Sequence, residues 1–211
     1  MKIDPLGNQL SPVRTSYAIV PREDEPRTLG LHQSAIANRL MVALGTYEAS
    51  DFDWDRMMMG QLMEAQVEAM LSGVFIDNHQ LQPSSYWGRV IRPGEFSVDT
   101  EVGPIYVTPD GYDVGHNANH ELKATWYSAK KPFTDPEFLG YRIQMKLACM
   151  ALGCLDSFLH VYYVNGNYAP PRPWPIQSFH FSFTETELHE NVEMLVQFVK
   201  ARPQLFPEAH V

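Results

Sequence analysis

The hydrophobic pattern of this chain changes its period near residue 86, and this change limits the folds that the chain can adopt. Before it, the stretches 31–44 and 54–71 repeat apolar residues at helical spacing. From Tyr86 to Trp126 the apolar residues occur in short runs broken by glycine and proline, which is typical of strands. We therefore expect two helices and then a meander of antiparallel strands at 86–91, 95–100, 105–108, 111–114 and 121–126.

The second half of the chain alternates between helix and strand. A helix is expected over 135–153, ending near Gly153, and a strongly apolar strand over 157–164. After a proline-rich loop, a strand over 176–183 leads into an amphipathic helix over 184–200. This order of elements predicts an α/β (α+β) fold, in which a central mixed sheet is flanked by helices on both faces.

Length and composition favour one soluble domain. With 211 residues, 45% of them apolar, the chain can bury a sizeable core as a single domain over 1–211. Four prolines within residues 1–28 indicate an extended N-terminal arm, and 202–211 forms a short tail. The sequence shows neither an apolar run long enough to cross a membrane nor a signal-peptide core, so we expect a cytoplasmic protein.

The formal net charge is −9, which argues against a general nucleic-acid coat because positive charge drives phosphate binding. The charge is unevenly distributed, however. Several basic residues fall within one short interval, namely Lys123, Lys130, Lys131, Arg142 and Lys146. A local basic groove on an otherwise acidic exterior would still allow the protein to bind nucleic acid.

Two cysteines are too few for a disulfide framework or an iron–sulfur cluster. Cys149 and Cys154 lie at the end of the helix expected over 135–153, where we expect them to be packing residues. The sequence also has no G-x-x-x-x-G-K-[ST] phosphate loop, so we expect that the chain does not use ATP by itself.

The stretch 108–125, TPDGYDVGHNANHELKAT, carries the residues with the most distinctive chemistry. Asp110 lies in a turn, while Glu121 and Lys123 lie two apart on a strand and share one face, with Leu122 on the other. Carboxylate oxygens suit a hard cation such as Mg²⁺ or Mn²⁺. A neighbouring lysine can bind a phosphate or position an attacking water. The pattern therefore suggests metal-dependent cleavage of a phosphodiester.

The order Pro109-Asp110 followed by Glu121-x-Lys123 resembles the signature of the PD-(D/E)XK nuclease superfamily. The run TPDG followed by ELK resembles, more narrowly, the motifs of the lambda-exonuclease and YqaJ-type phage recombination exonucleases and of RecB-like nucleases. The resemblance implies a restriction-endonuclease-like catalytic core over 54–164. It also implies that Asp110, Glu121 and the Leu122 carbonyl hold the metal, and that Lys123 acts on the water or the scissile phosphate.

Two further runs resemble motifs of the same groups. Gly60 to Glu64, GQLME, implies that Glu64 adds a carboxylate to the metal site. Taken alone, Glu64 would belong to a solvated acidic stripe with Glu68. The run Tyr141 to Lys146, YRIQMK, implies that Gln144 lies near the catalytic lysine and the DNA. Taken alone, Gln144 would be a polar residue at the edge of a helix core.

Two other parts of the stretch allow different interpretations. Asp113 competes with Asp110 for the role of turn carboxylate; we favour Asp110, since Pro109 and Gly111 flank it, and expect Asp113 at a strand end. The run HNANH over 116–120 lacks the cysteine pair and the spacing of a zinc site. We interpret it as a polar hairpin loop, with its last histidine on the opposite face of the sheet from the next residue.

The resemblance implies a Mg²⁺- or Mn²⁺-dependent deoxyribonuclease of the phage recombination exonuclease type, located in the host cytoplasm if phage-encoded. Its DNA partner would be a duplex end or a single strand, positioned by Lys130, Lys131, Arg142 and Lys146. A single-strand annealing protein and a homo-oligomer are further partners that it implies. Two alternatives stay open: a structure- or sequence-selective endonuclease on the same core, and an inactive nuclease fold that binds DNA or acts in assembly.

Overall fold

A computed structural model of the chain describes residues 2–3, 9–10, 28–46, 90–91, 93–125, 138–163 and 176–209. The helix expected over 54–71 lies outside the described residues, and so do Glu64, Lys130 and Lys131. None of the described helices combines the length and the apolar composition needed to cross a membrane.

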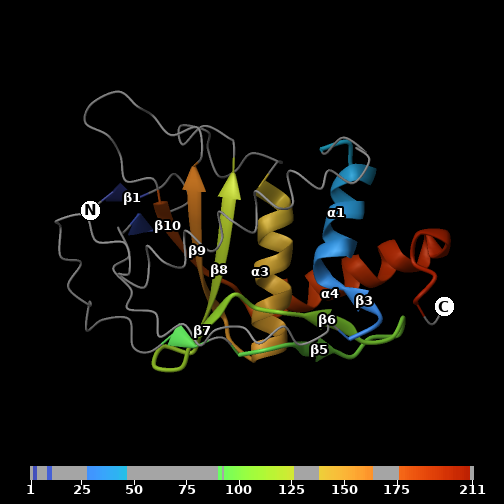
Figure 1. The fold of residues 1–211 in the computed structure, drawn as a ribbon, viewed down its shortest axis with the longest axis horizontal. Helices are drawn as coiled ribbons and strands as arrows, with labels where there is room; N and C mark the ends of the chain where they lie inside the picture. The colour runs from blue at the N-terminus through green and yellow to red at the C-terminus, as the bar shows by residue number, and fades with distance from the viewer. Residues whose placement is uncertain are drawn as a thin grey trace.

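The described strands form two sheets (Figure 1). The larger has the order β1-β2-β10-β9-β8-β7-β4, in which β8 and β9 are parallel and every other pair is antiparallel. The smaller has the order β3-β6-β5. The strands are β1 (Lys2–Ile3), β2 (Gln9–Leu10), β3 (Leu31–His32), β4 (Val90–Ile91), β5 (Phe96–Val98), β6 (Ile105–Val107), β7 (Gly111–Asp113), β8 (Ala118–Thr125), β9 (Asp156–Tyr163) and β10 (Ile176–Ser182).

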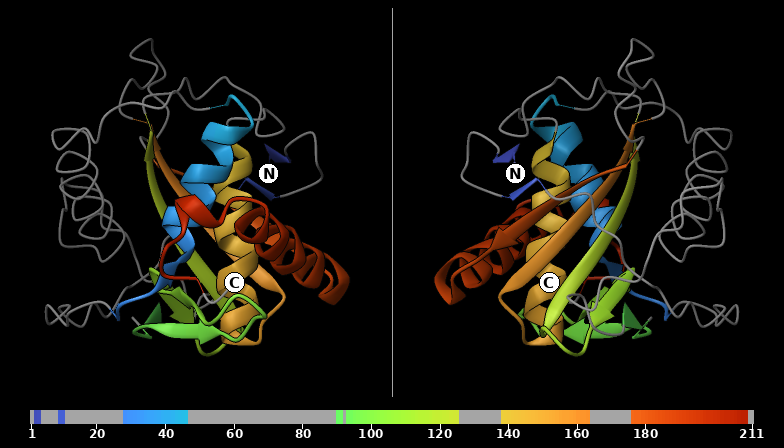
Figure 2. Two further views of the ribbon diagram at one scale, coloured as in Figure 1. Left: turned by 90° about the vertical axis from the view of Figure 1, so that its right-hand side faces the viewer. Right: turned by 90° about the vertical axis from the view of Figure 1, so that its left-hand side faces the viewer.

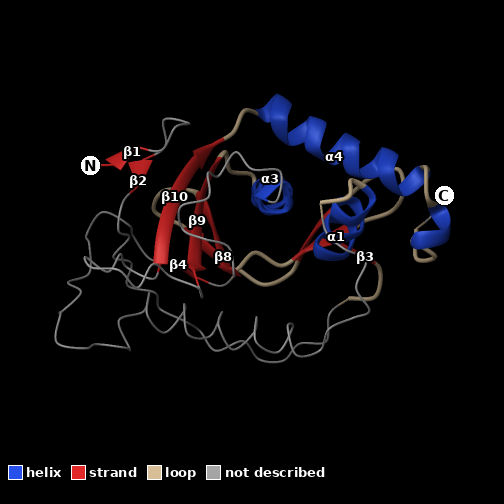
Figure 3. Cartoon of the chain, turned by 90° about the horizontal axis from the view of Figure 1, so that it is seen from above, coloured by secondary structure: helices blue, strands red, loops and turns tan. Residues whose placement is uncertain are grey.

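The described helices all lie on one face of the larger sheet (Figure 3). They are α1 (Gln33–Ala43), α3 (Leu139–Leu152) and α4 (Glu185–Lys200), with a short 3-10 turn, η2 (Pro203–Leu205), near the end. The helix α3 lies between the sheet and α1, and the side views show α4 crossing the other two (Figure 2). The mixed sheet flanked by helices is therefore confirmed, whereas the helices expected on its second face stay a prediction, because the described helices cover only one face.

The helix α3 is the centre of the core because it is apolar on two sides. Met145 and Cys149 pack with Leu159 and the rest of the sheet cluster. On the other side, Ile143 and Leu147 pack with residues of α1, α4 and the smaller sheet. A helix with apolar residues on both sides is stable only when it is buried on both. The sequence of α3 thus fixes its place between the two layers.

The strands over 86–126 do not form the single meander expected from sequence. The strand β4 occupies the place beside β7, with Val90 opposite Asp113, while β5 and β6 pair with each other and β6 pairs with β3. The reason is burial: Ile105 and Val107 of β6 pack into the cluster formed with α1 and α4. Burying these two apolar side chains in that cluster is more favourable than exposing them to water at an edge of the larger sheet.

The ends of the chain also pack more than expected. The segments β1 and β2, within the expected N-terminal arm, pair with each other, and Leu10 pairs with Phe179 of β10. Within the expected tail, Phe206 is 1% exposed and packs beside Phe198, under the guanidinium of Arg39. Aromatic burial of this kind anchors the segment after α4.

Candidate functional site

Asp110 lies beside β8 because the antiparallel register of β7 and β8 brings it there. Gly111 pairs with His120, so the next position along the ladder sets Asp110 opposite Glu121. The Oδ2 atom of Asp110 accepts a hydrogen bond of 2.8 Å from the backbone N–H of Leu122. Just before the first residue of β7, the carboxylate thus accepts the hydrogen bond that a backbone carbonyl would accept in a continued strand. The backbone of β8 therefore sets its position.

Lys123 lies between two carboxylates. Its Nζ atom is 4.0 Å from Oδ2 of Asp110 and forms a close ion pair with Oε1 of Glu121. The Glu121 side chain is 5% exposed, against 17% for Lys123 and 26% for Asp110. The contact confirms that Glu121 and Lys123 share one face of the strand. Because a buried carboxylate is costly unless it is paired, this ion pair is part of what allows Glu121 to be buried.

The face of β8 that carries Glu121 and Lys123 is the face covered by α3. In the parallel register Glu121 pairs with Leu159 and Lys123 with Val161. Both of these β9 residues belong to the apolar cluster that packs against α3. The helix α3 therefore covers the site on one side and forms its roof. This cover lowers the local dielectric and strengthens the attraction between the charges of the site.

Tyr141 of α3 is the residue of this roof that lies near Lys123. Its side chain hydrogen bonds with that of Thr125, and it interacts electrostatically with Lys123. Burial raises the pKa of the Tyr141 phenol, so the group stays protonated and able to donate near neutral pH. Sequence reasoning did not single out Tyr141. The available signal was its place three residues before Gln144, which puts the two side chains on neighbouring parts of one helix surface.

Gln144 lies on α3, partly buried, where α3 meets α1. Its backbone carbonyl accepts a hydrogen bond of 3.0 Å from Nε2 of Gln33. Its expected contact with the catalytic lysine and the DNA stays a prediction.

Arg142 and Lys146 lie elsewhere on α3. They line a groove of about 450 Å³ with residues of β10, of α4 and of the connection between them, among them Phe183 in the connection and Glu187 in α4. Lys146 pairs with Glu187 at 3.6 Å and lies 5.5 Å above the ring of Phe183. These two cations are thus placed toward α4 rather than with the carboxylates of β8, and their contact with DNA stays a prediction.

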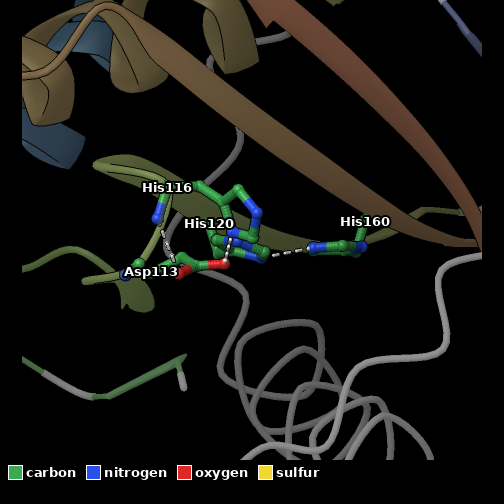
Figure 4. Close-up of polar contacts among 5 residues, drawn as sticks. Asp113, His116, His120 and His160 are labelled. Atoms are coloured by element: carbon green, nitrogen blue, oxygen red, sulfur yellow. Dashed lines mark hydrogen bonds and ion pairs between the residues drawn. The ribbon is translucent and has the colours of Figure 1, made fainter. Parts of the chain in front are cut away.

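The opposite face of the sheet carries histidines (Figure 4). His120 Nδ1 lies 2.9 Å from His160 Nε2, and His160 Nδ1 lies 2.8 Å from the hydroxyl of Ser178. Burial lowers the pKa of His160 to about 3, and burial together with the neighbouring His160 holds the pKa of His120 well below its usual value. Both imidazoles are therefore neutral near pH 7. This placement confirms that His120 faces away from Glu121.

The run over 116–120 is only partly the polar loop expected from sequence. Asp113, buried at the end of β7, accepts hydrogen bonds from the backbone of Gly115 and His116 and lies 2.8 Å from the His116 ring. Ala118 begins β8, and Asn119 and His120 are buried strand residues. The Asn119 amide donates to the Ser157 hydroxyl at 2.9 Å, a partner distant in sequence that allows a polar residue inside the sheet.

Asp110 and Glu121 supply the donors that a hard cation would use here. Their oxygens already converge on a positive charge, the Lys123 ammonium. Carboxylates and a backbone carbonyl such as that of Leu122 are the ligands that Mg²⁺ and Mn²⁺ prefer, so the donor set fits such an ion. Within the described residues no three His, Cys, Asp or Glu side chains are arranged to hold a metal. Glu64, the third expected carboxylate, lies outside them.

The sequence matches no family model and no characterised protein with which it was compared. The fold, a mixed sheet flanked by helices, is similar to that of several solved structures. One is the protein SSO0001, at 10% identity and a TM-score of 0.48, over 82% of this chain and 79% of that one. Another is LHK-Exo, an alkaline exonuclease from Laribacter hongkongensis, at 13% identity and a TM-score of 0.46, over 83% and 89%.

A phage-related exonuclease from Haemophilus somnus 129PT is similar at 17% identity and a TM-score of 0.42, over 79% of this chain and 78% of that one. LHK-Exo has also been solved in complex with dAMP. These are likenesses of fold at low identity. What the chain can do chemically follows from the side chains around β8.

Proposed function

We propose that this protein is a nuclease that hydrolyses DNA phosphodiester bonds with the help of Mg²⁺ or Mn²⁺, acting from DNA ends as an exonuclease. The observation that carries the proposal is the convergence of Asp110, Glu121 and Lys123 on one face of β8. Two carboxylates and an ammonium under a protein roof are the groups that metal-assisted hydrolysis of a phosphodiester requires.

The metal would be held by Asp110, Glu121 and the carbonyl of Leu122. When bound, a divalent cation lowers the pKa of a water ligand and stabilises negative charge on the reacting phosphate. The backbone N–H of Leu122 holds Asp110 in place through their 2.8 Å hydrogen bond, so this carboxylate does not need to be reoriented. A carboxylate that is already in position reduces the free-energy cost of assembling the site.

Lys123 would contact the scissile phosphate or the attacking water. In the structure its ammonium is taken up by Glu121 and Asp110. If these carboxylates also held a dication, their attraction for the ammonium would be weaker, since their negative charge would be shared between two cations. The lysine side chain could then turn its charge toward an anionic substrate, close to the phenol of Tyr141, with which it interacts electrostatically.

Basic residues would position the DNA strand outside the metal site. Arg142 and Lys146 line the groove between α3, β10 and α4, and Lys130 and Lys131 belong to the segment that joins β8 to α3. Because the chain as a whole carries a net charge of −9, DNA binding would depend on these local cations and weaken steeply with added salt.

The test compares an end-labelled linear duplex with a covalently closed circle of the same sequence, each with Mg²⁺ and with a chelator. Degradation of the linear DNA alone, and only with Mg²⁺, is the expected result. Cleavage of the circle would indicate endonuclease action on the same site. No cleavage of either DNA in Mg²⁺ or Mn²⁺ by purified, folded protein would overturn the proposal.

The matched controls come from a second lysine–glutamate pair. Lys200 and Glu101 form a close ion pair at the surface, and neither residue belongs to β8 or contacts Asp110, Glu121 or Lys123 in the ion pairs of the site. Lys200→Ala and Glu101→Gln should leave cleavage unchanged, whereas Glu121→Gln should abolish it. Equal losses of cleavage in the control variants and in Glu121→Gln would mean that the overall charge of the protein, and not the geometry at β8, is responsible for activity.

A further inference from the structure

The two cysteines lie at the C-terminus of α3, where the backbone geometry brings their side chains together. Gly153 follows the last helical residue with φ of 68°, in the left-handed region. The N–H of Cys154 donates to the carbonyl of Cys149 at 3.0 Å, and that of Gly153 to Met150 at 3.4 Å. This pair of bonds defines the Schellman motif, which places the side chains at these two positions in contact. In most helices that contact is apolar; here it joins two thiols.

Both sulfur atoms converge on one acceptor. Cys149 Sγ lies 3.6 Å from the backbone carbonyl oxygen of Asp156, and Cys154 Sγ lies 3.7 Å from the same atom. The two thiols also hydrogen bond with each other. Both cysteines are free and buried. Apolar packing alone accounts for the burial of the two cysteines. It does not require both sulfurs to bond to the same carbonyl oxygen and to each other.

The environment makes the two thiols unequal. The hydrogen bond that Cys149 donates is the main reason that the pKa of Cys154 is lowered, while burial and the charge of Asp156 oppose it. The same hydrogen bond, with burial, raises the pKa of Cys149. Cys154 is therefore the thiol that ionises first, and Cys149 keeps its proton as long as it supports the Cys154 thiolate.

A pocket of about 470 Å³ borders the pair. Cys149 and Cys154 both line it, together with the acidic residues Asp156 and Glu185 and the histidines His116 and His189. The two carboxylates favour a cationic reagent over an anionic one, and one of them, Asp156, also lies 2.8 Å from the ring of His180. A small cationic disulfide fits both the size and the charge of this opening.

We propose that Cys149 and Cys154 form a modification site: a dithiol that exchanges with a small cationic disulfide and closes into an intramolecular disulfide. This inference does not depend on the nuclease proposal, since no residue of the β8 site takes part. It replaces the expectation that the cysteines serve only for packing.

The exchange takes two steps. The Cys154 thiolate attacks one sulfur of the reagent, which forms a mixed disulfide and releases one reagent thiolate. The charge that held the Cys149 proton is then gone, so Cys149 loses that proton to solvent. Its thiolate attacks the Cys154 sulfur, forms the Cys149–Cys154 bond and releases the second reagent thiolate. Two protein thiols are oxidised, and one reagent disulfide is reduced to two thiols.

The test uses cystamine, a dicationic disulfide, and glutathione disulfide, which is anionic, at equal concentration on the full-length protein. Mass spectrometry of the intact chain and of its peptides follows the reaction. Cystamine should remove both thiol hydrogens and leave a cross-link between the two cysteines, at a rate about tenfold or more above that of glutathione disulfide. A protein that reacts with cystamine only after addition of denaturant would overturn the proposal.

Two single variants distinguish a dithiol site from two independent thiols. Cys149→Ser should stop at a mixed disulfide on Cys154, because the second thiol is missing. Cys154→Ser should leave Cys149 unmodified over the same time. Equal modification of both variants would contradict the assigned order, and a circular dichroism spectrum of each shows whether it is folded. The wild-type reaction needs no substitution, so it decides the matter even if a variant fails to fold.

Discussion

At the scale of single residues, the site depends on how Lys123 is held. Its ammonium is shared between a buried carboxylate, Glu121, and a more exposed one, Asp110. The two acids therefore have different roles before any ligand binds: Glu121 neutralises the lysine, and Asp110 is fixed by the backbone of Leu122. A cation held by these oxygens would compete with the Lys123 ammonium for them.

We expect Lys123→Ala to lose cleavage by on the order of a hundredfold or more, as for other groups that act directly at a reacting centre. The same variant should bind Mg²⁺ at least as tightly as the wild type, because the competing ammonium is gone. Single-turnover cleavage and calorimetric titration of Mg²⁺ measure the two effects. Weaker Mg²⁺ binding together with lost cleavage would show that the lysine serves the structure of the site instead.

We expect Tyr141→Phe to reduce cleavage by about tenfold at most, since one hydrogen bond contributes about 1 kcal/mol. The change removes the hydroxyl that bonds Thr125 and lies near Lys123 while keeping the ring. Tyr112→Phe is the control, because it also removes one bonded hydroxyl, the one that donates to Asn117 at 2.6 Å. If both variants cleave at the wild-type rate, Tyr141 is a packing residue.

At the scale of elements, the helix ends follow local chemistry. Thr184 and Glu187 form the capping box that begins α4, and Gly153 ends α3 with a left-handed conformation. The helix α1 ends in the same way, since Gly45 has φ of 70° and donates to Val42 at 2.9 Å. These signals lie within a few residues of one another, which is why the ends of the later helices were predictable from sequence.

Other features depend on contacts between distant residues and were not predictable in this way. The helix expected over 31–44 begins only at Gln33, because Leu31 and His32 pair with β6. Asn119 enters a buried strand because Ser157 accepts its hydrogen bond across the sheet. In the site, the alternation of β8 predicted the common face of Glu121 and Lys123. It could not predict the roof that α3 provides, which depends on how the layers pack.

We expect Gly153→Ala to lower the free energy of unfolding by about 1 kcal/mol, the cost of placing a Cβ atom in the left-handed region. Apart from Gly153 itself and its neighbours in the chain, no heavy atom lies within 4 Å of the position that this Cβ would take, so the cost comes from the local backbone conformation. Gly153→Asn should cost less, since asparagine tolerates this conformation better. Urea unfolding of both variants measures the difference, and equal losses would contradict a backbone origin.

At the scale of the whole molecule, the larger sheet separates two kinds of polar chemistry. The face under α3 carries the charged pair Glu121–Lys123, whereas the opposite face carries neutral histidines that bond to one another and to Ser178. The charged face is suited to binding ions. The histidine face stabilises the sheet only while its imidazoles stay uncharged, which ties the stability of the fold to pH.

We therefore expect the protein to lose stability as the pH falls below about 6.5, the ordinary pKa of histidine, toward about 3, the pKa of His160 in the folded state. In this window the unfolded chain binds a proton that the buried imidazole does not, so acid favours unfolding. His120 acts in the same direction, since burial and its neighbours lower its pKa as well. Each histidine contributes a slope of at most about 1.4 kcal/mol per pH unit.

Urea unfolding of the wild type and of His160→Gln between pH 7 and pH 4 tests this expectation. The variant keeps a side chain that can hydrogen bond but cannot titrate, so its stability should fall less steeply with acid than that of the wild type. His189→Gln, on the exposed side of α4, is the matched control and should keep the wild-type slope. A His160→Gln protein with an unchanged slope would show that the acid sensitivity comes from other groups and that His160 is no more than a hydrogen-bonding residue of the sheet.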